Sequence, residues 1–230
     1  MTRARTLTAV VVSVMGAACF RYEPDTPLAR AAAQGDGPAI ARLVAEGADP
    51  NGFDGHGGTA LITAARVGHV AAAEALIAAG ARVDLSDRGL TDWTPLMHAV
   101  HKRQTATARV LLDHGADPNA ETRGGVTALI MSAAYGDTDT VRLLLDRGAD
   151  PRARAQGGVT ALGNAIGGGF LFDITDGPGL GVCHPETVRL LLARAPDLRA
   201  APKARSPLTA WLGRGKGCDE ARALLEARHS

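Results

Sequence analysis

The 230-residue chain has few aromatic residues and almost no net charge. Phenylalanine, tryptophan and tyrosine make up 3% of it, and 25 Lys and Arg residues against 24 Asp and Glu residues give a formal charge of +1 at pH 7. A surface that binds nucleic acid usually needs a concentrated basic patch, which displaces counterions from the phosphates. The composition therefore argues against nucleic acid as a partner.

The sequence also lacks the motifs that usually accompany catalysis. It has no Gly-x-Ser-x-Gly elbow, and the glycine run at 167–169 is followed by no Gly-Lys-Ser/Thr phosphate loop. Among the seven histidines, His98 and His101 have the spacing to share a helix face, but a zinc site needs further ligands. We expect no enzymatic activity, cofactor or metal ion, with His98 packed between structural units and His101 exposed.

Most of the sequence is one unit repeated along the chain. A segment that begins with Thr or Ser recurs at intervals of 33, 35, 33, 33 and 46 residues, starting at Thr26, Thr59, Thr94, Thr127, Thr160 and Ser206. A period of this length is typical of a solenoid, in which each unit buries its apolar face against its neighbours.

Each unit predicts two short helices followed by a loop, as the segment from Thr127 onwards illustrates. The Thr127 side chain is suited to cap the first helix, and Gly136 to end it. The second helix carries Val141, Leu144 and Leu145 at spacings that bring apolar side chains onto one face. We expect these apolar stripes to form the core.

The repeated motifs TPLARAAAQGD, TALITAARVGH and TALIMSAAYGD, with GADPN at 47–51 and 115–119, closely resemble the ankyrin repeat. The resemblance implies an all-α fold, a solenoid of about six helix-turn-helix repeats with short β-hairpin-like loops. It assigns 26–230 to one repeat domain, with repeats near 26–58, 59–93, 94–126, 127–159 and 160–205 and a C-terminal cap at 206–230. It also implies that the loops and the concave face lined by the first helices bind another protein.

Side chains that vary on this repeated frame are the candidates for partner binding. On the loops they are Phe53, His56, Arg88, Trp93, Arg123, Arg154 and Gln156, and the loop at 85–93 is two residues longer than its counterparts. On the first helices they are Arg66, His101, Lys102 and Tyr135. We expect a minority of them to supply most of the binding energy, as at other interfaces.

The fifth repeat contains an inserted loop at 167–184 with an unusual apolar content. It holds Phe170 and Phe172, half of the four phenylalanines in the chain. The loop either folds back on its own array or presents an aromatic anchor to a partner. Asp173 and Asp176 in the same loop lack the ordered ligand spacing of a calcium site.

The N-terminal segment has the features of an export signal. Arg3 and Arg5 precede an apolar run from Leu7 to Val14, which is shorter than the roughly 20 residues that span a bilayer. The following MGAAC resembles a bacterial lipobox, although Gly16 stands where that family prefers Leu. We expect residues 1–18 to be cleaved, Cys19 to be lipidated and 19–25 to form a short linker. Simple secretion after Ala18 and a cytosolic module are the alternatives.

Two further cysteines, Cys183 and Cys218, each lie just before a predicted second helix. Stacked repeats would bring them side by side, and an oxidising compartment would allow a disulfide. Such a bridge closes a loop of about 36 residues and would contribute roughly 3 kcal/mol under the chain-entropy model. The alternative is two free thiols.

Together these features predict a monomeric protein–protein interaction module on the periplasmic side of a bacterial membrane, with the outer membrane favoured. Its role would be that of a scaffold or accessory binding protein without catalytic activity. The alternative is an immunity or inhibitor protein that occludes a toxic or periplasmic enzyme.

Overall fold

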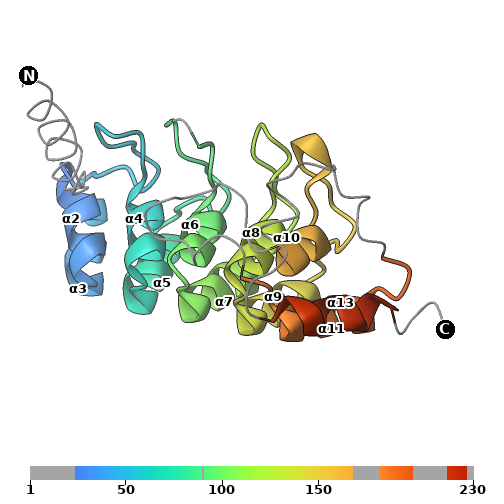
Figure 1. The fold of residues 1–230 in the computed structure, drawn as a ribbon. Coiled ribbons are helices and arrows are strands. Elements are labelled where there is room, and N and C mark those ends of the chain that lie inside the picture. Colours follow the sequence, from blue (N-terminus) through green and yellow to red (C-terminus); the bar gives the residue numbers. More distant parts are fainter. Residues whose placement is uncertain (1–23, 90, 168–181, 199–216, 227–230) are drawn as a thin grey trace, which may run out of the picture.

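The computed structural model describes residues 24–89, 91–167, 182–198 and 217–226, in which eleven α-helices stack in order along the chain (Figure 1). The first helices are α2 (Pro27–Gln34), α4 (Ala60–Val67), α6 (Pro95–His101), α8 (Ala128–Tyr135) and α10 (Ala161–Gly167). The second helices are α3 (Gly37–Ala45), α5 (Val70–Ala78), α7 (Thr105–Asp113), α9 (Thr138–Asp146) and α11 (Pro185–Arg194), and α13 (Cys218–Glu226) follows. The predicted all-α solenoid is confirmed.

The loops between repeats project from one edge of the array (Figure 1). We call them finger 1 (52–58), finger 2 (85–93), finger 3 (120–126) and finger 4 (153–159). Their β character is confined, in the described residues, to one isolated bridge between Phe53 and Thr59, and finger 4 contains a short 3-10 turn, η1 (Gln156–Gly158).

Each first helix begins and ends where its capping residues require. The N-cap threonine side chain accepts a hydrogen bond from the amide three residues later, as Thr127 does from Ile130 at 3.3 Å. Gly136 ends the same helix with φ of 65°, a left-handed conformation that glycine adopts without a steric penalty. The same arrangement at α2 and α4 explains why these helices are equally short.

The apolar stripes of the second helices are the core, as predicted. Each stripe contains at least one completely buried large side chain, namely Ile40, Leu76, Leu111, Leu144 and Leu191. In the first helices, Ala or Ser occupies the fifth position after each N-cap, which allows neighbouring first helices to approach closely. Each repeat therefore completes its core only by stacking on the next.

Polar side chains in the turns that follow the second helices join neighbouring repeats. Asn51 donates to the Gly80 carbonyl oxygen at 3.1 Å and accepts from the Arg82 amide at 2.8 Å. Asn119 does the same two repeats further along the chain, with Gly148 at 3.0 Å and Asp150 at 2.7 Å. These bonds fix the spacing of the repeats on the edge away from the apolar core.

A disulfide between Cys183 and Cys218 joins the fifth repeat to α13. Their Cα atoms are 4.9 Å apart, and both residues are buried, at 4% and 3% exposure. Cys183 lies two residues before α11, and Cys218 is the first residue of α13. The bridge therefore ties together the N-terminal ends of two packed helices.

His184 predicts a measurable pH dependence of stability. It is the half-buried N-cap residue of α11, and burial lowers the pKa of its imidazole below 6.5, an effect that Arg103 reinforces and a hydrogen bond with the Ala134 backbone opposes. Below about pH 6.5 the unfolded chain therefore binds a proton that the folded protein resists, so stability falls as the pH falls. Urea titrations from about pH 7.5 to about pH 5.5 should show this decline, and His184→Gln should reduce its slope. An unchanged slope in the variant would contradict this assignment.

Candidate partner-binding face

The fingers are braced internally and against one another. In finger 1, the buried Asp54 carboxylate accepts from the His56 and Gly58 amides at 3.0 and 2.8 Å. The amide of Arg88 in finger 2 donates to the Gly57 carbonyl oxygen at 2.8 Å. A matching bond runs from the Gln156 amide to the Gly124 carbonyl oxygen, also at 2.8 Å. Side chains on the fingers are thus presented from a fixed backbone.

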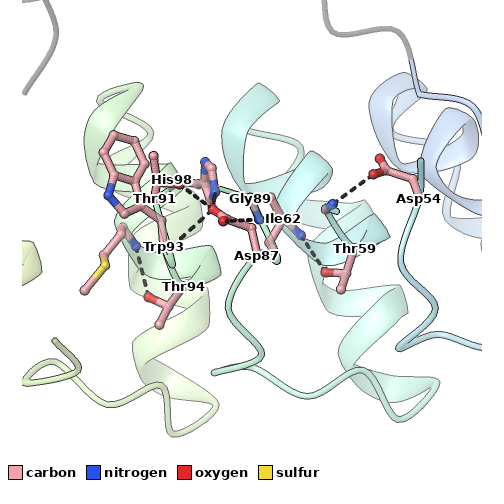
Figure 2. A network of polar contacts seen from close by, with 11 residues as sticks. Asp54, Thr59, Ile62, Asp87, Gly89, Thr91, Trp93, Thr94 and His98 are labelled. Carbon is pink, nitrogen blue, oxygen red and sulfur yellow. Dashed lines mark hydrogen bonds and ion pairs between the residues drawn. The ribbon is translucent and has the colours of Figure 1, made fainter. Parts of the chain in front are cut away.

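Finger 2, the longest, is organised around Asp87, which is 8% exposed (Figure 2). Its Oδ2 atom accepts hydrogen bonds from Thr91 Oγ1 at 2.7 Å, the Trp93 amide at 3.2 Å and His98 Nε2 at 2.9 Å. Burial raises the pKa of the carboxyl, but the hydrogen bonds from His98 and Thr91 outweigh it and hold the pKa below its ordinary value. This network fixes the backbone position of Trp93 at the end of finger 2, two residues before α6 begins.

Trp93, His98, His101 and Tyr135 form a continuous aromatic row across two repeats. The Trp93 ring centroid lies 5.4 Å from that of His98 and 4.9 Å from that of His101. His101 in turn lies 5.7 Å from Tyr135, and its Nδ1 atom is 2.6 Å from the Tyr135 hydroxyl. The prediction that His101 is exposed is wrong, because Trp93 and Tyr135 half-bury it.

Backbone strain flanks the same helix. Among the described residues, the non-glycine residues with positive φ are Asp92, at 53°, and Arg103, at 55°. They lie just before and just after α6. A non-glycine residue in the left-handed region costs of order 1–3 kcal/mol, and such positions cluster at binding and catalytic sites. The strain therefore indicates that α6 and the residues beside it are the candidate centre of the partner-binding face.

Both strained residues have ordered side chains. Asp92 accepts from Arg123 Nη2 at 2.9 Å, which links finger 2 to finger 3. Arg103 donates from Nη2 to the Tyr135 carbonyl oxygen at 3.1 Å, and its guanidinium carbon lies 5.8 Å from the Tyr135 ring centroid. Neither Asp92 nor Arg103 was among the candidates chosen from the sequence. The sequence did contain a signal for Arg103, because glycine occupies the corresponding position after α2, α4 and α8.

The comparisons with known proteins agree with this geometry. Two segments, residues 9–87 and 83–155, match the family model of ankyrin repeats. The chain belongs to the ankyrin repeat family. Over 111 residues, 48% of its length, this ankyrin array is 40% identical to an ankyrin repeat-containing protein of Treponema pallidum (strain Nichols), and the match spans 37% of that protein. Ankyrin repeats are typically non-catalytic modules that bind other proteins.

The array places the other predicted contact residues on two surfaces. On the fingers, the Arg88 guanidinium lies 3.8 Å from the Phe53 ring centroid, while Gln156 Nε2 donates to the Arg123 carbonyl oxygen at 3.3 Å. His56 and Arg154 are exposed there as well. At the ends of the first helices, Arg66 and Lys102 are half-buried, and Tyr135 is buried at 6% exposure. Cys19, Phe170 and Phe172 lie outside the described residues.

No metal-binding cluster stands out in the described ranges, where no three or more His, Cys, Asp and Glu side chains gather. Within residues 24–89, 91–167, 182–198 and 217–226, no helix has the length and apolar character needed to cross a membrane. The groups that the described face presents are aromatic rings, guanidinium groups and fingers held by backbone hydrogen bonds.

Proposed function

We propose that this ankyrin array is a scaffold or accessory binding protein that holds another protein on the periplasmic side of a bacterial membrane, without catalytic activity of its own. The observation that carries the proposal is the concentration of aromatic and arginine side chains on the fingers and α6, beside two strained residues. Aromatic and arginine residues dominate the energetics of protein interfaces. The repeated frame behind them supplies a rigid support.

The proposed location follows from two features. The N-terminal segment has the pattern of an export signal that ends at Cys19, the proposed lipid anchor. The Cys183–Cys218 disulfide is of a kind that forms and persists outside the reducing cytosol. Mass measurement of the native protein tests the anchor directly, because an intact Met1 or an unmodified Cys19 would exclude lipidation.

Affinity capture from an envelope extract tests the binding role. Arg88→Ala combined with Arg123→Ala removes two exposed finger guanidiniums and should abolish recovery of the partner. Arg109→Ala combined with Arg142→Ala is the matched control, because these exposed arginines lie on the second helices α7 and α9. Equal recovery with both double variants would remove the fingers from the site.

A second variant, Phe170→Ser combined with Phe172→Ser, tests the inserted loop in the same assay. We expect it to abolish capture while the circular dichroism spectrum stays unchanged, since buried aromatic anchors contribute strongly to interfaces. Undiminished capture would leave the site to the fingers and first helices. A captured enzyme that loses activity on binding would make the chain an inhibitor rather than a scaffold.

A further inference from the structure

Acidic side chains are distributed unevenly between the two helical layers of the array. The first helices α2, α4, α6, α8 and α10 contain no Asp or Glu, whereas Arg30, Arg66, Lys102 and Arg103 lie on them or at their C-terminal ends. The second helices and the residues directly after them carry side chains of both signs. The acidic ones include Glu46, Glu74, Asp113, Asp139, Asp146 and Glu186, and the basic ones include Arg42, Arg109, Arg142, Arg147, Arg189 and Arg194. The first helices themselves therefore carry a net positive charge, and the acidic residues Asp36 and Asp137 lie two residues after α2 and α8.

Among these basic residues, Arg103 is the one with a strained backbone conformation. Gly35, Gly68 and Gly136 adopt the left-handed conformation just after α2, α4 and α8, and Arg103 adopts it after α6. Glycine would satisfy the backbone here without strain. An arginine at this point is not explained by the backbone, which indicates that its side chain has another use.

The surroundings of Arg103 leave its guanidinium oriented and accessible. The residue is exposed, and Nη2 is anchored on the Tyr135 carbonyl oxygen. A guanidinium has further N–H groups in one plane, which suit bidentate contact with a carboxylate. Anchoring one edge of the group lowers the entropy lost when the other edge binds.

We propose that Arg103 is a partner-contact residue that binds carboxylate side chains of an acidic segment in the partner protein. This inference rests on the proposed function and names the chemistry of its partner. The net positive charge of the first helices favours such a segment. The aromatic row beside Arg103 offers apolar surface between the charges.

One acidic neighbour supplies a converse test. An open hollow of about 410 Å³ is lined by Arg103, Thr105, Gly136, Asp137, Thr138 and Asp139. Both Asp137 carboxylate oxygens are bonded by Thr140, through its amide at 3.1 Å and its hydroxyl at 2.7 Å. Asp137 and the exposed Asp139 place two negative charges near the positive charge of Arg103. Asp139→Asn removes one of them and should strengthen binding of an acidic segment.

The test uses a fluorescent oligoglutamate peptide and the full chain at low ionic strength, about 20 mM, where screening is weak. Arg103→Gly and Arg103→Gln should each weaken the anisotropy-derived Kd about threefold to tenfold, the range for loss of one ordinary hydrogen bond in water. Asp139→Asn should tighten it about twofold. Arg109→Gln on α7 is the charge-matched control and should leave it unchanged.

Measuring the stability of the same variants distinguishes a role of Arg103 in partner recognition from a purely structural role. Arg103→Gly should raise the urea midpoint because it relieves the strain, whereas Arg103→Gln should not. Binding that is unaffected by both substitutions, or single-stranded DNA that binds more tightly than oligoglutamate, would overturn the inference. Loss of envelope capture by the finger variants together with Arg103-independent oligoglutamate binding would refute this inference alone and leave the proposed function standing.

Discussion

Replacing Leu144 by alanine should lower the free energy of unfolding by about 2–5 kcal/mol. Leu144 is fully buried in the last turn of α9, within the continuous apolar cluster of the array. The substitution removes favourable burial and leaves a cavity that close-packed neighbours refill only in part. Because the stability of a solenoid is a sum of repeat and nearest-neighbour contributions, the loss includes the contacts of α9 with the repeats on both sides.

Chemical denaturation followed by circular dichroism measures this change, and Gln156→Ala is its control. Gln156 is exposed on finger 4, and the substitution keeps the bond from its backbone amide to finger 3. It removes only the exposed side-chain bond from Nε2 to the Arg123 carbonyl oxygen. Substitutions at such surface sites usually change stability by less than about 0.5 kcal/mol. Comparable losses at Leu144 and Gln156 would show that the apolar stripe does not form the core.

Removing the disulfide, through Cys183→Ala combined with Cys218→Ala, should cost about 3–4 kcal/mol. The bridge closes a loop with a sequence separation of 35 residues, and in the chain-entropy model its main effect is to restrict the unfolded chain. Both cysteines are small and buried, so alanine keeps most of their packing. The unfolding midpoint of the native protein should fall on addition of a reductant, while that of the double variant should not respond.

The destabilisation caused by removing the disulfide should be confined to the C-terminal end of the described array. Amide hydrogen exchange in α13 should accelerate far more than exchange in α4 or α8, because α13 packs against α10 and α11 at the C-terminal end of the described array. A native protein whose thiols are shown by mass to be reduced, yet whose midpoint is unchanged, would assign the bridge no stabilising role.

The repeat architecture could be predicted because its signals are local and recur. Each N-cap threonine acts on an amide three residues away, and each stripe of branched residues follows one helix, so neither depends on distant contacts. The match between predicted and observed helix starts at Thr26, Thr59, Thr94 and Thr127 follows from this. The regular spacing of the units then implied that they stack.

The candidate partner-binding face could be predicted from the sequence only in part. Variation on the frame selected Trp93, His101 and Tyr135 as separate candidates, but not their contact with one another. The Asp87–His98 hydrogen bond was not predicted, although the sequence indicated that His98 packs between repeats. His101 was expected to be exposed because the residues that cover it come from finger 2 and from the following repeat.

From the sequence alone follow the helical hairpins, their order and the apolar stripes that they share, because capping and periodicity act within a few residues along the chain. The aromatic row, the Asp92–Arg123 link and the left-handed Arg103 were decided only in the tertiary structure. The physical reason is that these features depend on the distance between side chains of neighbouring repeats and on backbone angles set by the packing around α6.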